Sequence, residues 1–480
     1  MLSETIRKLP AKYARVAAIA RYFREHPEVL RGYFSYARRL GLLSALSRLI
    51  KSIAQGGGRR ILAPPAATPQ LLLRSGSGEP IVILASSQYL YIGQSISAAL
   101  SQVGIEASII QEPPIHGYGS GLHLVICARM FAQLPPSYIV FHLEQLVGSN
   151  WFTEDYLRIL ENAAAILDYS TANIGFLTHK GLNSRQIFYV PLDHPADYRF
   201  EPDYELEDRG IAAENRLLLK GQSNRFDYFF YRFLLATDNI TFEEFWNQAG
   251  HKAELPSDTI CLSLPEYVER ATAFNEENRF GFSCFPGLRH TQSWIGCAMS
   301  YKLLIMLARQ QGLRQITICE DDVEFPPDFE MRWRDIQECL NDPDITWDIF
   351  AGLIADLDKD IQVLATYKFG SQQFAVINKL MSMVFNVYSK RVYDAMAEWD
   401  ENNHDVTTNT IDRYLERHGA LNILTIDPFL VGHKESQQST IWGVDNSHYT
   451  DLILASGRLL KEKILAYNSN TKLPCKHDNC

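Results

Sequence analysis

Short apolar runs alternate with longer stretches of helical pattern between residues 81 and 190. Runs of this length that consist mainly of Ile, Val, Leu and Phe are typical of buried strands. The pattern also predicts helices over residues 93–103, 152–165 and 171–180, each between two such runs. Alternation of strand and helix predicts a parallel sheet with crossover helices, which is a Rossmann-like α/β fold. The predicted strands cover residues 81–85, 107–110, 123–127, 138–142, 165–168 and 187–190.

Polar side chains follow the fourth predicted strand of this region. His142 is its last residue, and Glu144 comes two positions later. Ligands of open parallel sheets bind at the carboxyl ends of the strands, so these two residues are candidates for an acceptor-binding or second site. A hydrogen-bonded pair that closes the strand end is the structural alternative. No Gly-x-Gly-x-x-Gly sequence follows the first strand, so a dinucleotide cofactor is not predicted.

A later strand pattern ends in three consecutive acids. Residues 316–319 have strand character, Glu320, Asp321 and Asp322 follow, and the apolar pattern then returns. Carboxylates gathered at the exit of a buried strand can hold a divalent cation. Glu320 and Asp322 would share one face if the strand continued through them, and Asp321 would lie on the other face. An acidic turn on the surface is the alternative.

Breaks in composition divide the chain into five segments. Its 480 residues exceed the size of one ordinary domain, and a stretch rich in Gly and Pro at residues 55–69 separates a first segment from the rest. The predicted segments are a helical arm (1–60), a Rossmann-like domain (78–200), a helical connector (201–255), a second α/β domain (256–450), and a C-terminal helix and tail (451–480).

Positive charge is concentrated in the first segment. Residues 1–60 carry a net charge of +10, whereas the whole chain carries −10. Apolar residues recur there at three- and four-residue steps, which predicts a basic amphipathic arm. Such an arm can bind an anionic membrane surface, or it can pack on the acidic body or on a partner subunit. Nucleic acid is not a predicted partner, because the body is acidic and no stacking motif interleaves the basic residues.

Cysteine usage and hydropathy bear on the cellular compartment. The eight cysteines show no framework spacing, and several lie in apolar segments, which is typical of reduced thiols. No apolar run reaches the length of a membrane span, and the N-terminus lacks the apolar core of a signal peptide. We therefore expect a cytoplasmic protein, peripheral at the inner membrane if the basic arm binds lipid.

Six motifs follow one another in the second half of the chain. They are Thr259-Ile-Cys-Leu-Ser-Leu264, Trp294-Ile-Gly-Cys-Ala-Met-Ser-Tyr301, Glu320-Asp-Asp322, Trp347-Asp-Ile349, Ile411-Asp-Arg-Tyr-Leu415 and Ser439-Thr-Ile-Trp442. In this order and spacing, residues 257–445 resemble the glycosyltransferase family 25 domain, which occurs in bacterial lipooligosaccharide galactosyltransferases and in collagen galactosyltransferases. The resemblance implies a GT-A-like domain that uses a nucleotide-sugar. Residues 78–200 more faintly resemble the N-terminal half of GT-B-type glycosyltransferases, in Asp168-Tyr-Ser170 and Tyr189-Val-Pro-Leu192.

The resemblance and the chemistry of sugar transfer together assign roles to the acids. Glu320 and Asp322 would hold Mn²⁺ or Mg²⁺ at the diphosphate of the donor, with His433 as a later ligand. A separate carboxylate must take the proton of the acceptor hydroxyl, and Asp412 is the candidate, with Asp321 as the second catalytic residue. The alternatives are that Asp412 only stabilises a helix N-terminus and that His433 is a solvated loop residue.

The residues expected to bind the sugar donor lie near the first strand of the second α/β domain and in the long helix predicted after residue 294. Ser263, Arg270, Ser300 and Tyr301 are the candidate donor-binding residues. Two positions depart from the family pattern. Tyr301 stands where the family has His, and Arg270 is what remains of the basic residues expected after the first strand.

The expected function is transfer of a sugar, galactose in the first instance, from UDP-galactose or a related donor. The acceptor would be a lipopolysaccharide-type or other bacterial surface glycan or glycolipid, and the reaction would invert the anomeric carbon. Two alternatives stay open: an enzyme in which both halves transfer sugars, and a non-catalytic scaffold in glycan assembly.

Overall fold

The computed structural model describes residues 68–71, 73, 80–145, 152–192, 225–419 and 421–470. The predicted basic arm over residues 1–60 lies outside these ranges, as do the first part of the connector and the tail beyond residue 470. All helices and strands named below belong to one compact unit, which takes in the described residues of 68–437 and 446–470.

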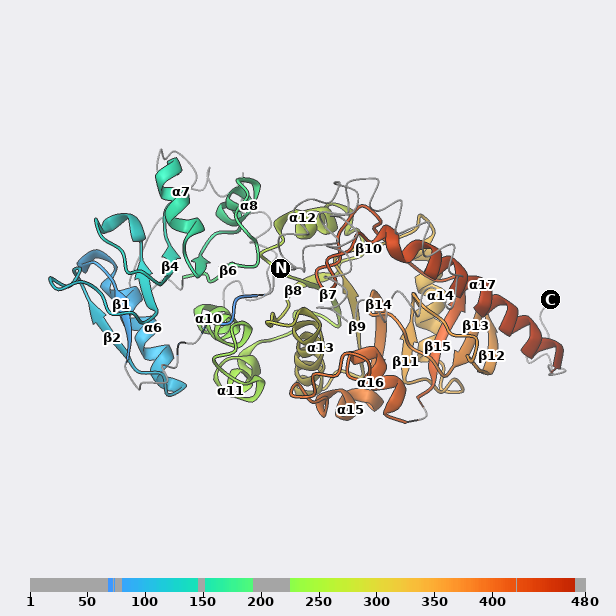
Figure 1. The fold of residues 1–480 in the computed structure, drawn as a ribbon. Coiled ribbons are helices and arrows are strands. Elements are labelled where there is room, and N and C mark those ends of the chain that lie inside the picture. Colours follow the sequence, from blue (N-terminus) through green and yellow to red (C-terminus); the bar gives the residue numbers. More distant parts are fainter. Residues whose placement is uncertain are drawn as a thin grey trace, which may run out of the picture. The chain divides into compact units, whose positions relative to one another are not determined.

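A six-stranded sheet forms the first α/β region (Figure 1, blue to green). The strand order is β2-β1-β3-β4-β5-β6, and every neighbouring pair is parallel. Each strand falls within one predicted apolar run, so the prediction of a Rossmann-like parallel sheet is confirmed. The strands are β1 (Ile81–Leu84), β2 (Ala107–Ile110), β3 (His123–Ile126), β4 (Tyr138–His142), β5 (Ala165–Asp168) and β6 (Ile187–Tyr189).

Side-chain caps start two of the helices that follow these strands. The helices are α6 (Leu90–Gln102), α7 (Glu154–Glu161) and α8 (Thr171–His179). Thr153 Oγ1 accepts a hydrogen bond from the N–H of Tyr156, and Ser170 Oγ accepts one from the N–H of Asn173, so α7 and α8 begin at satisfied N-caps. The order places β1 between β2 and β3, so the sheet grows in opposite directions from β1. This reversal is the topological switch point at which such sheets bind ligands.

An eight-stranded mixed sheet forms the second α/β region, in the order β12-β13-β15-β11-β14-β9-β7-β8. The pairs β7–β8, β7–β9 and β11–β15 are parallel, and the others are antiparallel. The short strands β10 (Val323–Glu324) and β16 (Gly432–His433) pair separately. The eight strands are β7 (Thr259–Ser263), β8 (Ser283–Pro286), β9 (Gln315–Glu320), β11 (Ile349–Ala351), β12 (Val363–Phe369), β13 (Gln372–Ile377), β14 (Phe385–Ser389) and β15 (Ile423–Asp427).

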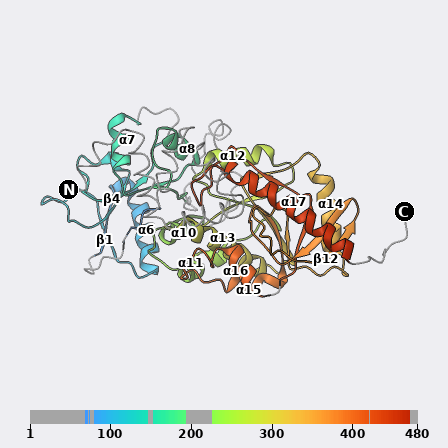
Figure 2. The ribbon, with the colours of Figure 1, turned by 45° about the vertical axis from the view of Figure 1, so that its right-hand side comes forward.

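Six helices accompany the mixed sheet in the described ranges. They are α12 (Val268–Glu277), α13 (Ser293–Gln310), α14 (Phe329–Asn341), α15 (Tyr393–Ala397), α16 (Ile411–Arg417) and α17 (Ser447–Asn470), with 3₁₀ turns at Ser87–Tyr89, Ala128–Met130, Gly250–Lys252 and Lys390–Val392 elsewhere in the chain. The long helix α17 lies beside β12 (Figure 2), where Tyr467 Oη donates to the carbonyl oxygen of Leu364 at 3.0 Å. Among residues that the structure describes, no helix is both long and apolar enough to cross a membrane.

Two aromatic helices pack between elements of both sheets. They are α10 (Arg225–Ala236) and α11 (Phe242–Gln248), and the aromatic side chains of α10 are buried. Tyr231 Oη donates to the carbonyl oxygen of Ala99 in α6, and Tyr228 Oη donates to that of Pro286 in β8, both at 3.0 Å. The second part of the connector is therefore helical, as the sequence predicts, and its aromatic rings belong to the core.

A buried ion-pair network joins the edge of the parallel sheet to the mixed-sheet region. Arg232 of α10 forms two hydrogen bonds to the carboxylate of Glu266, at 2.6 and 3.0 Å. Glu266 also accepts from the N–H of Tyr189 in β6 at 3.0 Å. Arg289 donates to the carbonyl oxygens of Ile187 and Arg185, at 2.6 and 2.7 Å. The guanidinium of Arg289 also lies over the ring of Phe188 in β6, 4.3 Å from its centroid. Because the hydrogen bonds of β6 at this junction come from its backbone, they left no pattern in the sequence.

We predict that the ionisation of Glu266 contributes to stability in acid. Burial alone would raise the pKa of Glu266, but Arg232, Arg289 and the N–H of Tyr189 outweigh it and lower this pKa from 4.5 to about 2. Because the folded pKa lies below the unfolded one, the stabilisation is complete above the unfolded pKa and is lost as the pH falls toward the folded one.

Urea unfolding at stepped pH, on the intact protein and on Glu266→Gln, tests this. The variant should be less stable at neutral pH, and its free energy of unfolding should fall less steeply in acid. Equal slopes for the two proteins would assign the acid sensitivity to other groups.

Candidate functional site

The three acids lie at the end of β9, where the strand stops. Glu320 is the last residue of β9, Asp321 and Asp322 form a turn, and β10 begins at Val323. The N–H of Lys434 donates to the carbonyl oxygen of Asp322 at 2.7 Å, next to the β10–β16 pair. The strand does not continue through the acids, so the condition under which Asp321 would lie on the opposite face from Asp322 is not met. The turn directs both aspartates to one cation, Arg270.

Arg270, on the first turn of α12, forms ion pairs with both aspartates and offsets part of their charge. Its Nε donates to Asp321 Oδ1 at 2.9 Å, its Nη2 forms a second bond to the same oxygen, and Nη2 lies 3.2 Å from Asp322 Oδ2. Ser263, at the end of β7, donates to Asp321 Oδ2 at 2.7 Å. Burial would lower the pKa of Arg270, but the two aspartates raise it above its ordinary value, so this side chain stays charged. Both oxygens of Asp321 are thus engaged by protein groups.

Glu320 lies deeper, among groups of the long helix α13. Tyr301 Oη is 3.5 Å from Glu320 Oε1, and Cys297 Sγ donates to the same oxygen at 3.9 Å. Burial, and next the negative charge of Asp322, raise the pKa of Glu320 to about 8. Asp412 contributes to the same shift. The cluster therefore concentrates negative charge beyond what Arg270 offsets.

Asp322 carries an oxygen without a partner. Its Oδ2 accepts a hydrogen bond from Asn446 Nδ2 at 2.9 Å. Its Oδ1 is buried and has no hydrogen-bond partner in the described part of the chain. An unsatisfied buried carboxylate oxygen is costly, and such an atom is where a cation or a ligand donor would bind. Asn446 was not found by sequence reasoning, because a neutral amide in a loop gives no pattern.

His433 is oriented by the same loop. Its Nε2 donates to the carbonyl oxygen of Asn446 at 2.7 Å, which leaves Nδ1 as the acceptor nitrogen of the ring. His433 is buried, so the alternative of a solvated loop histidine does not hold. Its role as a metal ligand stays a prediction.

The acidic cluster is the predicted site of a divalent cation. Within the described ranges, no group of three or more His, Cys, Asp or Glu side chains is arranged to hold a metal ion. A magnesium ion at a nucleotide site needs fewer protein ligands, because one or two carboxylates, the phosphates of the substrate and water together complete its coordination shell. Glu320 and Asp322, with its unpartnered Oδ1, could supply such carboxylates, and metal binding here stays a prediction.

Asp412 lies close enough to this cluster to act on its charges. It stands in the first turn of α16, where Oδ1 accepts from Thr410 Oγ1 at 2.6 Å and from the N–H of Arg413 at 2.9 Å. Its negative charge raises the pKa of Glu320 and that of Cys297. The hydrogen bonds at Oδ1 are typical of an acid that stabilises a helix N-terminus. A catalytic base would also have to lie near the bound nucleotide-sugar, and the effect of Asp412 on Glu320 agrees with such a place. The catalytic role stays a prediction.

Ser300 and Tyr301 are bound within the protein. Ser300 Oγ accepts from the N–H of Leu288 and donates to the carbonyl oxygen of Gly296, both at 2.7 Å. Tyr301 Oη donates to the carbonyl oxygen of Met383 at 2.8 Å. A Cβ on Gly296 would lie 2.8 Å from the backbone N of His290, so α13 needs glycine there to pack against that loop. Ser300 thus helps to place α13, and its role as a donor ligand stays a prediction.

The other predicted pair, His142 and Glu144, lies at the carboxyl end of the parallel sheet. His142 Nδ1 donates to Asp168 Oδ2 at 2.5 Å, and its Nε2 lies 3.3 Å from Glu144 Oε2. Cys127 Sγ donates to Glu144 Oε1 at 3.4 Å. Burial would lower the pKa of His142, but Asp168 and Glu144 outweigh it and raise the pKa. Asp168 and Cys127 complete a cluster of which the sequence indicated two members.

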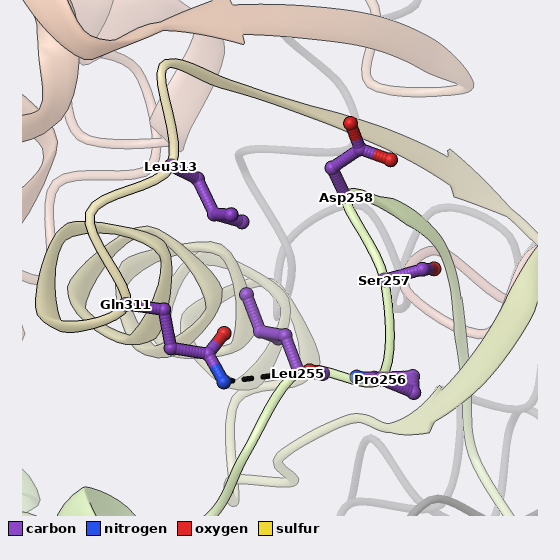
Figure 3. Close-up of a pocket in the computed structure, with 6 residues that line it drawn as sticks. All are labelled: Leu255, Pro256, Ser257, Asp258, Gln311 and Leu313. Carbon is purple, nitrogen blue, oxygen red and sulfur yellow. Dashed lines mark hydrogen bonds between the residues drawn. The ribbon is translucent and has the colours of Figure 1, made fainter.

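A separate pocket of about 410 Å³ lies beside the start of β7 (Figure 3). Gln311, just after α13, donates from Nε2 to the carbonyl oxygen of Leu255 at 3.4 Å within it. Ser257 and Asp258 precede β7, so this pocket is at the amino end of the strand, whereas Ser263 and the acids are at the carboxyl ends. None of the predicted site residues lines it.

Comparison with models of known protein families finds none that matches this chain, and no curated protein matches it either. The resemblance to glycosyltransferase family 25 therefore depends on the ordered motifs of residues 257–445 alone, and function has to be inferred from the geometry of the acidic cluster.

Proposed function

We propose that this chain is a glycosyltransferase of the family 25 type. It would transfer a hexose, galactose in the first instance, from a nucleotide-sugar to a lipopolysaccharide-type or other bacterial surface glycan. The observation that carries the proposal is the unpartnered, buried Oδ1 of Asp322 beside Glu320 at the carboxyl end of β9. Carboxylates at that place, with an oxygen in need of a cation, suit a metal-bound diphosphate.

Each residue of the cluster has a task in such a transfer. Glu320 and Asp322 would hold Mn²⁺ or Mg²⁺, which as a Lewis acid offsets the charge of the departing diphosphate. Asn446 fixes Asp322 by donating to its Oδ2, and Ser263 and Arg270 fix Asp321 by donating to its two oxygens. The acceptor hydroxyl attacks the anomeric carbon, the bond from that carbon to the diphosphate oxygen breaks, and Asp412 takes the hydroxyl proton. Attack opposite the leaving group inverts the anomeric carbon.

Location and acceptor form part of the same proposal. We place the enzyme in the cytoplasm, at the inner face of the membrane, because the basic segment of residues 1–60 carries a net charge of +10. A glycolipid acceptor would be reached there. The scaffold alternative requires loss of the acids, whereas all three are present, and Arg270, Ser263 and Asn446 hold the two aspartates in place.

A specific observation favours the second candidate, an enzyme with two transferring halves. The parallel sheet carries its own buried cluster of His142, Glu144 and Asp168 at the carboxyl ends of its strands. An enzyme of this kind would lose one sugar linkage, and keep the other, when His142 and Glu144 are replaced together by alanine.

Thermal unfolding with nucleotide-sugars tests the proposed function. We expect UDP-galactose, or another nucleotide-hexose of the panel, to raise the melting temperature when Mn²⁺ or Mg²⁺ is present and to have little effect in EDTA. Ligand at a hundredfold excess over its Kd stabilises a protein by about 2.7 kcal/mol, which moves the melting temperature by several degrees. NAD⁺ is the control nucleotide. If no nucleotide-sugar of the panel raised the melting temperature in a metal-dependent way, the proposal would be wrong.

A further inference from the structure

The carboxyl edge of the parallel sheet holds buried polar groups that the transfer chemistry does not use. The edge surrounds the switch point between β1 and β3, where ligands of such sheets bind. Ser86 follows β1 and Cys127 follows β3, with His142 and Glu144 at the end of β4. Ser87 and Gln145 beside them are exposed, so the edge reaches the protein surface.

Two hydroxyl groups at this edge are buried without hydrogen-bond partners. In the described part of the chain, neither Ser86 Oγ nor Tyr156 Oη has a partner within ordinary hydrogen-bond geometry. Tyr156 lies near Glu144, where burial, next the Glu144 charge, and then a long hydrogen bond to Glu144 raise the pKa of Tyr156 above the ordinary value. Native proteins leave few buried polar atoms unsatisfied, because each costs free energy. Ser86 Oγ after β1 and Tyr156 Oη near Glu144 are therefore candidate partners for a ligand at this edge.

Backbone strain points to the same place. Cys127 has a positive φ of 55°, a conformation that side chains other than glycine seldom adopt. In this conformation its thiol donates to Glu144 Oε1. Strained residues persist where the surrounding structure requires them, and they gather at ligand sites. Burial, and next the Glu144 charge, raise the pKa of Cys127 to about 12, so the group is a neutral hydrogen-bond donor there.

The charges at this edge favour a ligand without phosphate. The buried groups are the carboxylates of Glu144 and Asp168 and the ring of His142, so even a protonated His142 leaves one negative charge in excess. Arg129 acts on Cys127, but it is exposed and screened by water. A diphosphate would meet repulsion at Glu144, whereas a hydroxyl group would donate to it.

An aromatic surface lies against the polar groups. The ring centroid of Phe152 is 5.4 Å from that of His142, 6.3 Å from that of Tyr156 and 5.0 Å from that of Phe176. Phe152 and Phe176 are only partly buried. Hydroxyl groups on a ring with apolar faces match such a surface, because ligand sites combine aromatic walls with a few placed polar groups.

We propose that this edge is a binding site for a neutral glycan, with a sugar hydroxyl donating to Glu144 and with Ser86 Oγ and Tyr156 Oη as further hydroxyl partners. Asp168 is a positioning residue, since it acts through His142. The site does not depend on the chemistry proposed for the acidic cluster of β9, and it would bind glycan even if that cluster transferred nothing.

A glycan array that carries both neutral and phosphorylated or sialylated glycans tests the proposal with the full-length protein. We expect binding to neutral glycans, retained by Glu324→Gln at the exposed carboxylate of β10 and reduced by about tenfold or more in Glu144→Gln, since loss of a hydrogen bond to a charged group has that effect. Absence of binding to every neutral glycan would overturn the proposal. So would binding confined to anionic glycans, or binding that Glu144→Gln leaves unchanged.

Ser86→Ala separates a binding role from a structural one. Removal of an unpartnered buried hydroxyl should leave the melting temperature of the free protein unchanged or raise it, because no hydrogen bond is lost. Affinity for the neutral glycans found on the array, measured by isothermal titration calorimetry, should fall at the same time. A folded Ser86→Ala protein that binds those glycans as tightly as the intact one would refute the assignment of Ser86 to the site.

Discussion

Replacing Asp322 with asparagine should lower the rate of sugar transfer by about 10²–10³-fold, the usual effect of removing one electrostatic contact to a developing charge. Asparagine keeps an oxygen at nearly the same place but removes the charge that would bind a cation. The fold should persist, because a like charge beside Glu320 is removed and Asn446 can still donate to the remaining oxygen. Release of UDP from UDP-galactose in the presence of Mn²⁺ measures the rate.

Glu324→Gln is the matched control for this experiment. Glu324 is a carboxylate two residues further along, in β10, and it is exposed. Its neutralisation should change the rate by less than about twofold, as expected for an exposed group outside the site. If Asp322→Asn retained the rate of the intact enzyme, or if EDTA left that rate unchanged, the metal-assisted mechanism would be wrong.

The second large effect should come from Arg232→Met. Glu266 would keep its buried charge but lose its closest partner, and breaking a buried pair in this way costs about 3–5 kcal/mol. Arg289, whose Nη1 lies 3.8 Å from Glu266 Oε1, offsets only part of this loss. The free energy of unfolding in urea should fall accordingly, with a lower midpoint.

Arg158→Met provides the comparison for this loss. Arg158 also forms an ion pair, 2.9 Å from Asp155, but its side chain is 65% exposed. Exposed pairs contribute about 0–1 kcal/mol, so the urea midpoint should scarcely move. Similar losses for Arg158→Met and Arg232→Met would mean that burial does not set the energetic importance of the Arg232 pair.

The parallel sheet could be predicted nearly residue by residue, and the reason is physical. The strands β3, β4, β5 and β6 are buried on both faces, so they appear as continuous apolar runs, as in residues 138–142. The antiparallel part of the mixed sheet gives a weaker signal. In β12 only Thr366 is buried and the other positions are partly buried or exposed, so no continuous apolar run marks the strand.

The acidic cluster could be located from the sequence, but its geometry could not. The run of three acids after an apolar strand identified Glu320 and Asp322 correctly as neighbours at a strand end. The turn at Asp321 depends on Arg270, 51 residues earlier, and the orientation of Asp322 depends on Asn446, 124 residues later. Spacing within a motif carries no information about such partners. Whether these residues catalyse sugar transfer stays a prediction.

The junction of Glu266 and Arg289 with β6 has a consequence for dividing the protein. The sequence suggests a boundary near residue 256, yet Glu266 and Arg289 lie after it and bind backbone groups of residues 185–189 before it. A fragment that begins at residue 256 would carry a buried carboxylate and a buried guanidinium without these partners. The two α/β regions therefore have to be kept together. If the first half were exchanged between related chains, the hybrid would fold only where the backbone of β6 kept its position.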